Sequence, residues 1–492
     1  MSAVRAADFR VAVTNDSELV TQGRLLLFFS QQDEGEPRLY DYYPTASNSR
    51  IFATNVERWA VGEKRKFSDE FSGYPVAALE QLPAGTWRVQ ALLDHNVFSA
   101  DLNSDGNLYS DVVILQVPEK GKLDLTLALK NQVQAEPLPE SSELIKYVEF
   151  KSEVLSNFWQ RDVSLKAAVL LPNSYQTRVN QFYPVIFQIG GFRQRYTRVQ
   201  ELFEDKDFKN YWYSPEAPQA IVVFLDGEAP FGDSYQLNSK NNGPYGDATW
   251  QELLPYLQQT FRIEQDGDGF FTTGCSTGGW VSLALQIYQP ELFNGAWSFS
   301  ADPVDFSAFQ LVDIYKDANA FVSEHGPLRP SAREQDGEVV FTIKDEAAME
   351  SALAIDGNFV RSSGQWGAWM ALFSPRGSDG LPMPLWDGEG VINRELANTW
   401  RQWDLRWYLE TNWRNVGPAL AGKLHLYMGE MDDYYLNNAM RRFEDMLTAR
   451  TNPESDAKFH WQPRGGHCDS SAGEMLQTVL PQALERWQAA KQ

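Results

Sequence analysis

A serine flanked by glycines is the first residue in this chain with the setting of a nucleophile. Residues 274–279 read Gly-Cys-Ser-Thr-Gly-Gly, at the end of the strand pattern GFFTTG and before the helical pattern WVSLALQIYQP. A Gly-x-Ser-x-Gly motif between a strand and a helix is typical of a nucleophile elbow, a strained turn that lifts the hydroxyl above the strand ends. The pattern predicts Ser276 as the nucleophile and the Thr277 N–H as one oxyanion donor. The alternative is a glycine-rich turn with a purely steric role.

A serine nucleophile needs a base, and one of the five histidines has the expected setting. His425 and His460 lie inside strand patterns, His95 lies in an N-terminal β region, and His325 lies in a long irregular segment. His467 lies in the glycine-rich loop RGGHCDSS, between the last predicted strand and the last predicted helix. Because the partners of an elbow serine follow it in chain order on loops after later strands, His467 is the predicted base.

The acid that orients the base is expected a few residues after the strand pattern KLHLYMG. The sequence continues with three acidic residues, Glu430, Asp432 and Asp433. The spacing from the strand end favours Asp432, with Asp433 next. Asp302 or Asp305, which follow an earlier strand pattern, are the alternatives.

The second oxyanion donor is expected on the loop after the strand pattern YPVIFQIGG. Glycine leaves a backbone amide accessible to substrate, so the N–H of Gly191 or Phe192 is the candidate. A steric turn is the alternative for this glycine pair.

These residues require a sheet that places them together, and the second part of the chain predicts one. From about residue 145, continuous apolar strand patterns alternate with amphipathic helical patterns. This alternation indicates a mostly parallel sheet covered by helices on both faces, as in an α/β-hydrolase fold, over residues 141–492. Residues 306–417 interrupt the alternation with a long, Trp-rich and turn-rich stretch, which predicts a lid-like insertion.

The first part of the chain, residues 1–140, has a different pattern. Short runs with period-2 alternation, such as GRLLLFFS and WRVQALLDH, are separated by turn residues, without a helical stripe. This pattern predicts an all-β, sandwich-like domain of the immunoglobulin type. The polar segment LKNQVQAEPLPESSELIK is the expected linker.

Three tryptophans are candidates for substrate contacts. Trp280 follows the glycines of the elbow, and Trp366 and Trp369 lie in the insertion. Aromatic side chains above the strand ends would form an apolar or sugar-binding wall beside Ser276. The alternative is that the insertion uses its aromatic residues as its own core.

Composition excludes several classes of partner. The 492 residues contain 43 basic and 66 acidic side chains, a formal charge of −23, which disfavours nucleic acid. No run of apolar residues is long enough for a membrane span, and the start MSAVRAADFR lacks the apolar core of a secretory signal. No spacing fits zinc, phosphate or dinucleotide binding, so we expect no metal and no cofactor.

The two cysteines of the chain are adjacent to the two main candidates. Cys275 precedes Ser276 and Cys468 follows His467. If the serine and the histidine are in contact, these neighbours come within the distance that a disulfide needs. The sequence therefore predicts a Cys275–Cys468 bond and a periplasmic or secreted protein whose signal has been removed, with a cytoplasmic protein as the alternative.

The motifs together carry a resemblance. Gly274-Cys275-Ser276-Thr277-Gly278-Gly279, the acid near Asp432 and the pair His467-Cys468 resemble the Cys-Ser, Asp, His-Cys signature of the tannase and feruloyl esterase family. That family has Arg where this chain has Trp280. The layout as a whole resembles the putative-esterase superfamily, which includes esterase D and enterochelin esterase.

Both resemblances imply a serine carboxylic ester hydrolase that works through an acyl-enzyme. The substrate is then a small-molecule or polymer-linked ester. The resemblance to the tannase and feruloyl esterase family implies feruloyl, galloyl or terephthalate types, whereas the resemblance to the putative-esterase superfamily leaves the acyl and alcohol groups open. A serine peptidase on the same triad and a non-catalytic glycan- or partner-binding protein remain alternatives. The oligomeric state stays open.

Overall fold

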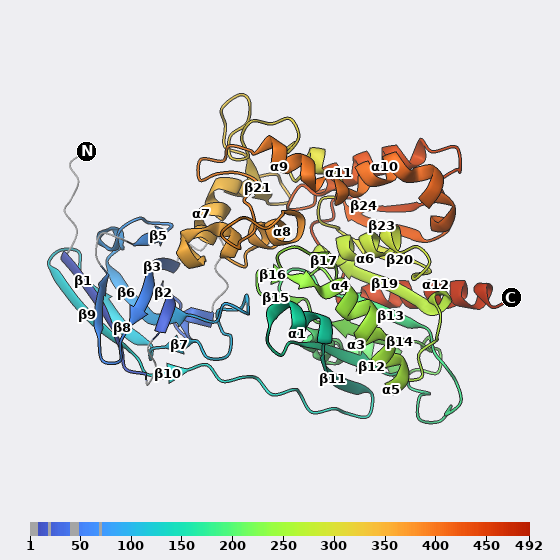
Figure 1. The fold of residues 1–492 in the computed structure, drawn as a ribbon, viewed down its shortest axis with the longest axis horizontal. Helices are drawn as coiled ribbons and strands as arrows, with labels where there is room; N and C mark the ends of the chain where they lie inside the picture. Colours follow the sequence, from blue (N-terminus) through green and yellow to red (C-terminus); the bar gives the residue numbers. More distant parts are fainter. Residues whose placement is uncertain (1–7, 18–20, 40–48, 68–70) are drawn as a thin grey trace.

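The computed structural model describes residues 8–17, 21–39, 49–67 and 71–492, in two regions joined by an extended segment (Figure 1). The described residues up to Gln132 form strands and short 3-10 turns, and from Ile145 onwards strands alternate with helices. Residues 133–144 contain neither a helix nor a strand. The change from one pattern to the other thus falls where the polar linker was expected.

The N-terminal region is a β-sandwich of two sheets. One sheet has the strand order β4-β1-β9, and the other has the order β10-β7-β6-β2-β3-β5, with β8 paired to β6. Alternate apolar side chains of both sheets, including Val13, Leu27, Val89 and Leu125, share a core with Trp87. The predicted all-β region is confirmed. Its strands are β1 (Asp8–Asn15), β2 (Thr21–Ser30), β3 (Ser49–Trp59), β4 (Lys64–Phe67), β5 (Ser72–Tyr74), β6 (Gly85–Asp94), β7 (Leu108–Tyr109), β8 (Val113–Val117), β9 (Lys122–Leu129) and β10 (Asn131–Gln132).

The C-terminal region is built on an eight-stranded sheet with the order β11-β12-β14-β13-β19-β20-β23-β24. β12 runs antiparallel to both its neighbours, and every pair from β14 to β24 is parallel. The strands are β11 (Ile145–Lys151), β12 (Ser164–Leu170), β13 (Val185–Ile189), β14 (Ile221–Leu225), β19 (Phe270–Cys275), β20 (Ala296–Phe299), β23 (Leu424–Gly429) and β24 (Lys458–Gln462). This topology confirms the predicted α/β-hydrolase fold.

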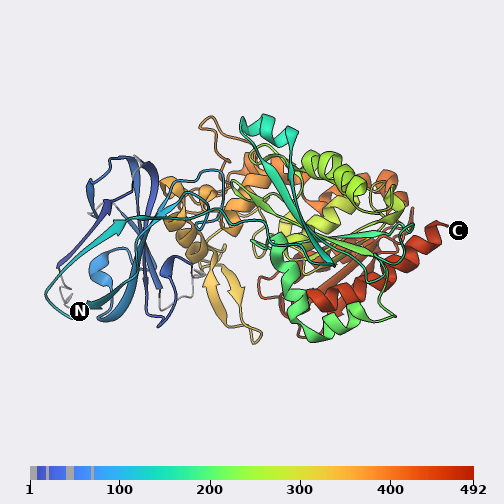
Figure 2. The ribbon, with the colours of Figure 1, turned by 90° about the horizontal axis from the view of Figure 1, so that it is seen from below.

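Helices cover both faces of this sheet (Figure 2). On one face, α2, α3 and α12 pack against side chains such as Ile186 and Phe271. On the other, α5, α6, α10 and α11 pack against side chains such as Phe187 and Val223. These helices, together with α1 and α4, are α1 (Glu153–Trp159), α2 (Val199–Glu204), α3 (Lys206–Tyr213), α4 (Tyr245–Asp247), α5 (Leu254–Thr260), α6 (Thr277–Tyr288), α10 (Leu405–Val416), α11 (Asn437–Thr448) and α12 (Ala472–Ala490). None of the helices in the described residues is long and apolar enough to cross a membrane.

The long segment between β20 and β23 is packed against the sheet region. Its aromatic side chains, including Phe309, Trp366 and Trp386, are buried in the same hydrophobic core as the helices on that face. α8 also contacts the short strands β16 and β17. The elements named here are β15 (Glu228–Ala229), β16 (Gly232–Asp233), β17 (Asn238–Ser239), β18 (Gly243–Pro244), β21 (Pro330–Arg333), β22 (Val339–Thr342), α7 (Ile343–Leu353), α8 (Gln365–Phe373) and α9 (Arg394–Thr399).

The sandwich packs against α7, which lies between the two regions (Figure 2). Leu26 and Phe28 of β2 form an apolar cluster with Met349 and Leu353 of α7. The Arg24 guanidinium donates a hydrogen bond of 3.1 Å to the carbonyl of residue 352 in α7. One outer face of the sandwich is therefore an internal surface of the protein.

Candidate active site

Ser276 lies at the turn between β19 and α6 in a strained backbone conformation. Its φ is 59° and its ψ is −125°, a combination that residues other than glycine rarely adopt. The turn is also tight, because a Cβ on Gly278 would lie 2.2 Å from the carbonyl oxygen of Ile189 at the end of β13. The strand–turn–helix context expected from the sequence is present.

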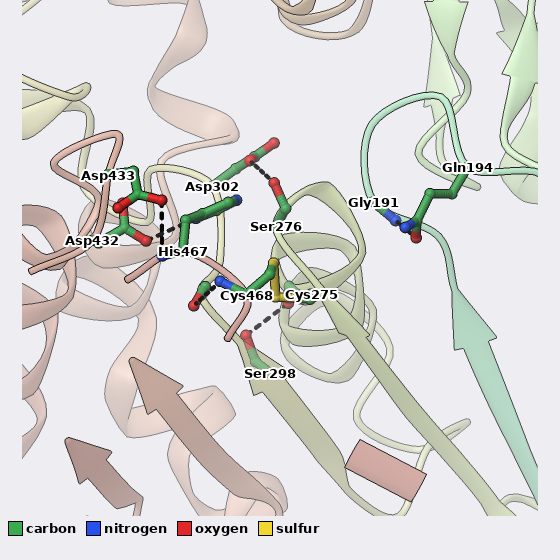
Figure 3. Close-up of a disulfide and its surroundings, with 12 residues drawn as sticks. Gly191, Gln194, Cys275, Ser276, Ser298, Asp302, Asp432, Asp433, His467 and Cys468 are labelled. Carbon is green, nitrogen blue, oxygen red and sulfur yellow. Dashed lines mark hydrogen bonds and ion pairs between the residues drawn. A yellow bond between two sulfur atoms is a disulfide. The ribbon is translucent and has the colours of Figure 1, made fainter. Parts of the chain in front are cut away.

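His467 and Asp432 form a hydrogen-bonded pair (Figure 3). The His467 Nδ1 and Asp432 Oδ2 atoms are 2.7 Å apart. Asp432 is fully buried, and its Oδ1 accepts hydrogen bonds from the N–H groups of Tyr434 at 3.0 Å and Leu436 at 3.1 Å. Because an ionised carboxylate only accepts, Nδ1 carries the ring proton and Nε2 is left as an acceptor.

The other acidic candidates have different partners. Asp433 accepts a hydrogen bond of 3.3 Å from the backbone N–H of His467, not from its ring. Glu430 pairs with a surface arginine, and Asp305 caps the short helix that follows it. Among these candidates, the structure thus brings Asp432 to the imidazole.

The carboxylates around His467 raise its pKa. Burial opposes the protonated ring, but the charge and the hydrogen bond of Asp432 outweigh burial, and Asp302 and Asp433 contribute further. The pKa of His467 therefore lies above its ordinary value of 6.5. The site favours the imidazolium that a general base forms when it accepts a proton.

The Ser276 hydroxyl contacts a second carboxylate, that of Asp302 (Figure 3). The distance from Ser276 Oγ to Asp302 Oδ1 is 3.4 Å, and within the described part of the chain this is the one side-chain hydrogen bond of the hydroxyl. The expected hydrogen bond between Ser276 and His467 is not formed here.

Asp302 is itself held rigidly. Its Oδ2 accepts hydrogen bonds from the Tyr235 hydroxyl at 3.0 Å, the Thr277 hydroxyl at 3.0 Å and the Trp369 indole at 3.1 Å. Burial raises the pKa of the Asp302 carboxyl, and these three donors oppose that shift. With Oδ2 saturated, Oδ1 is the atom presented to Ser276.

Ser276 and His467 open onto a cavity of about 570 Å³. The cavity has an apolar side, formed by Leu102 of the sandwich together with Phe341, Met349 and Leu353. The remainder is lined by further apolar side chains, such as Phe192, Leu436 and Met475, and by charged and polar groups, among them Arg193, Gln194, Arg198, Gln310, Glu346 and Glu350. The sandwich and the 306–417 segment thus both contribute to the wall of the site.

The two candidate oxyanion donors differ in their present state. The Thr277 N–H is the first amide of α6, so no carbonyl within the helix accepts from it. Gly191 lies beside the elbow, since a Cβ on it would be 3.3 Å from the Cys275 carbonyl oxygen. The Gly191 N–H donates to Gln194 Oε1 at 2.9 Å (Figure 3). Gln194 must move before this amide can serve, whereas Phe192 simply lines the cavity.

The expectation of an aromatic wall is wrong for two of the three tryptophans. Trp280 and Trp366 are fully buried and do not line the cavity. Trp369 does line the cavity, but it is only 2 % exposed and its indole N–H is bonded to Asp302. Large apolar side chains stabilise most when they are buried, so Trp280 of α6 and Trp366 of α8 pack into the hydrophobic core.

Two glutamates of α7 lie on the same cavity and were not anticipated. Glu350 accepts hydrogen bonds from the N–H groups of Trp366 at 3.0 Å and Gly367 at 3.1 Å. Burial, and then the charge of Glu346, raise the pKa of Glu350 to about 8, so it is mostly protonated at neutral pH. Their position one helical turn apart on a cavity wall follows from tertiary packing, for which the sequence carries no local signal.

Cys275 and Cys468 form a disulfide with a Cα–Cα distance of 6.0 Å, as the sequence predicts. The bond joins the residue before Ser276 to the residue after His467 across 193 positions of the chain. It therefore ties the nucleophile turn to the histidine loop.

Removal of this disulfide is expected to lower both stability and activity. Closing a loop of this length nominally contributes about 5 kcal/mol, and the bond also holds the two loops in register. The double substitution C275S/C468S, or complete reduction with dithiothreitol checked by counting thiols, should lower the melting temperature and the rate of ester hydrolysis. A fully reduced protein with an unchanged melting temperature and rate would contradict this account.

A family model described as putative esterase matches residues 160–472, more than half of the chain. Similar solved structures include an S-formylglutathione hydrolase from Agrobacterium tumefaciens, with 14 % identity, 72 % of this chain and 98 % of that chain covered, and a TM-score of 0.40. A CE1 ferulic acid esterase from Anaeromyces mucronatus has 12 % identity, covers 71 % of this chain and 95 % of its own, and has a TM-score of 0.34. No curated protein matches the chain. Because the family match contains the elbow, the acid loop and the histidine loop, the chain belongs to the putative esterase family and is an ester hydrolase.

Proposed function

We propose that the protein is a serine carboxylesterase that works through an acyl-enzyme. Ser276 is the nucleophile, His467 the general base and Asp432 the acid that orients the base. The observation that carries the proposal is the 2.7 Å contact between His467 Nδ1 and Asp432 Oδ2, on a cavity shared with the strained Ser276. The disulfide between the neighbours of Ser276 and His467 supports the same assignment.

The chemistry follows from the available donors and acceptors. Ser276 Oγ attacks the ester carbonyl carbon while its proton passes to His467 Nε2. The carbon–oxygen bond to the alcohol then breaks, and His467 returns the proton to the alcohol oxygen. Water attacks the acyl-enzyme with the same proton transfers and releases the acid and the free serine. The Thr277 and Gly191 amides hold the oxyanion in both steps.

Two side chains must move before acylation. The Ser276 hydroxyl must leave Asp302 for His467 Nε2, and Gln194 must leave the Gly191 amide. Asp302 then remains near the imidazole, where its charge contributes to the raised pKa of His467. Asp302 acts in this scheme as a positioning residue for the serine and the histidine.

The cavity supports substrates with groups of aromatic size. Its volume of about 570 Å³ is far larger than an acetyl group requires. The apolar side formed by Leu102, Phe341 and Met349 suits an aromatic ring or a long acyl chain. With the signature shared with tannases and feruloyl esterases, these features support feruloyl, galloyl or terephthalate-type esters.

The disulfide also supports a location outside the reducing cytoplasm. Structural disulfides persist in oxidising compartments such as the periplasm or the extracellular space. We therefore place the protein there in this proposal. Its partner in either compartment is a small-molecule or polymer-linked ester.

A fluorophosphonate should label Ser276, and the wild type should hydrolyse p-nitrophenyl acetate. Ser276→Ala should abolish labelling and lower kcat by roughly 10⁴-fold or more, because the nucleophile is lost. Mass spectrometry locates the label, and a panel of acetyl, feruloyl, galloyl and terephthalate esters with aminoacyl amides measures the preference. A folded wild type that is unlabelled and inactive would refute the proposal, and faster cleavage of the amides would favour a peptidase.

Neighbouring aspartates should differ sharply in their effect on turnover. Asp432→Asn should lower kcat by roughly 10³- to 10⁴-fold, because an amide no longer fixes the tautomer of His467. Asp433→Asn, one position along the same turn, should lower kcat less than tenfold, since Asp433 contacts only the backbone N–H. Steady-state kinetics with circular dichroism as the folding control distinguishes them. Equal losses, or the reverse order, would contradict the assignment of Asp432.

Asp302→Asn should shift the acidic limb of the kcat/KM profile to lower pH. The base acts when its ring is neutral, so activity rises as pH passes through the pKa of His467. The Asp302 carboxylate raises that pKa, and an amide in its place removes the charge, so the limb moves down. Glu430→Gln, which alters a surface acid that follows β23 and pairs with Arg441, is the control and should leave the limb in place. An unmoved limb in Asp302→Asn would show that Asp302 carries no charge at these pH values.

A further inference from the structure

Arg198 is a buried guanidinium on the wall of the active-site cavity. It ends the short 3-10 helix Tyr196–Arg198 that follows the β13 loop, it is 8 % exposed, and it lines the same cavity as Ser276. Burial lowers the pKa of Arg198 to about 10, so the side chain keeps its charge at neutral pH. A buried charge is unfavourable unless acceptors surround it.

The acceptors of Arg198 are few. The nearby Arg195 donates to both oxygens of Asp226, at 2.7 and 2.9 Å. In the described part of the chain, Arg198 forms no ion pair, and the one acceptor that its guanidinium contacts is the side-chain oxygen of Gln194. A guanidinium has five N–H donors, so one neutral amide oxygen leaves most of its capacity unused.

Gln194 links this arginine to the reaction. Its Oε1 accepts from the Arg198 guanidinium and also from the Gly191 N–H, the candidate oxyanion donor. When an ester carbonyl takes the Gly191 amide, Gln194 must be displaced. Arg198 then loses its single hydrogen-bond acceptor unless the substrate supplies another. A substrate with an acceptor for Arg198 therefore binds more favourably than one without it.

The start of α12 lies near Arg198 on the cavity wall. Ser470, Ser471 and Ala472 at the start of α12 line the cavity, and the first turns of α12 share a hydrophobic cluster with α2, next to Arg198. The amino end of a helix of 19 residues favours anions, although Glu474 occupies part of this end by bonding to Ser471. Of the acidic groups on the cavity, Glu346 and Glu350 lie on α7 and Asp302 lies beside Ser276, whereas Glu201 of α2 acts on Arg198 through its charge, although the two form no ion pair in the described residues.

We propose that the substrate ester carries a carboxylate, in its acyl or its alcohol part, and that the Arg198 guanidinium binds this carboxylate. The inference rests on the proposed ester hydrolysis at Ser276 and adds the chemical class of the substrate. A planar guanidinium matches a carboxylate with two parallel hydrogen bonds, which a single amide oxygen cannot provide.

Two matched pairs of esters test the proposal. In the first pair the charge is on the acyl side, with mono-4-nitrophenyl adipate compared with the analogue whose free carboxylate is replaced by a carboxamide. In the second pair it is on the alcohol side, with 4-acetoxybenzoate compared with 4-acetoxybenzamide. The wild type should prefer the anionic member of at least one pair in kcat/KM, by roughly tenfold, mainly through KM.

Variants of Arg198 connect this preference to the residue. Arg198→Gln should reduce the ratio of anionic to neutral kcat/KM to about one. Arg198→Lys should also reduce it, because an ammonium keeps the charge without the planar pair of donors. Arg178→Gln removes an exposed arginine from the segment between β12 and β13, which does not line the cavity, and should leave both the ratio and the basal rate unchanged.

The results of these experiments distinguish failure of carboxylate binding by Arg198 from failure of the proposed ester hydrolysis. Equal hydrolysis of both members of each pair by the wild type overturns the binding of a carboxylate and leaves ester hydrolysis intact. An unchanged ratio in either folded Arg198 variant overturns the role of Arg198. If Arg198→Gln does not fold, Arg198→Lys decides. A wild type that hydrolyses none of the four esters and is not labelled by a fluorophosphonate refutes the proposed function itself.

Discussion

Parallel pairing of β19, β20, β23 and β24 determines where this protein can do chemistry. The pairing registers bring the carboxyl ends of these four strands to one edge of the sheet. Ser276, Asp302, Asp432 and His467 each follow one of these ends, although they are far apart in the chain. The contacts of the site, from the His467–Asp432 pair to the disulfide, can form only while that edge is intact. Disruption of the sheet would therefore also disrupt the geometry of the site.

Charge is distributed unequally around the reacting atoms. Three carboxylates, Asp302, Asp432 and Asp433, act on His467 and favour its protonated form. The Gly191 N–H, a candidate oxyanion donor, and the Arg198 guanidinium both bond to Gln194 on the wall of the same cavity. A proton moves from serine to imidazole as negative charge moves from serine to the carbonyl oxygen, so each developing charge meets the opposite sign.

Local patterns in the sequence were sufficient for the parts of the site that local geometry dictates. The elbow requires glycine at Gly278, so the motif itself predicts the turn, and the two cysteines revealed that the serine and histidine loops meet. The choice of Asp432 over Asp433 rested on spacing, because two neighbours on one turn differ only in the direction of their side chains. The period-2 runs GRLLLFFS and WRVQALLDH, which predicted an all-β region, correspond to β2 and β6.

The features of the site that depend on tertiary packing have no local signal in the sequence. The sequence is compatible with Trp280 and Trp366 either on the cavity wall or in the hydrophobic core, and in the structure both are packed in the core. Leu102, Glu350 and Arg198 reach one cavity from the sandwich, from α7 and from the segment after β13, and no sequence spacing links these three regions. The electrostatic effect of the charged residues on a ligand is local, because charges more than about 10 Å away are largely screened at 0.1 M salt. The overall charge of −23 therefore does not exclude an anionic ligand from a site whose wall carries the guanidinium groups of Arg193 and Arg198.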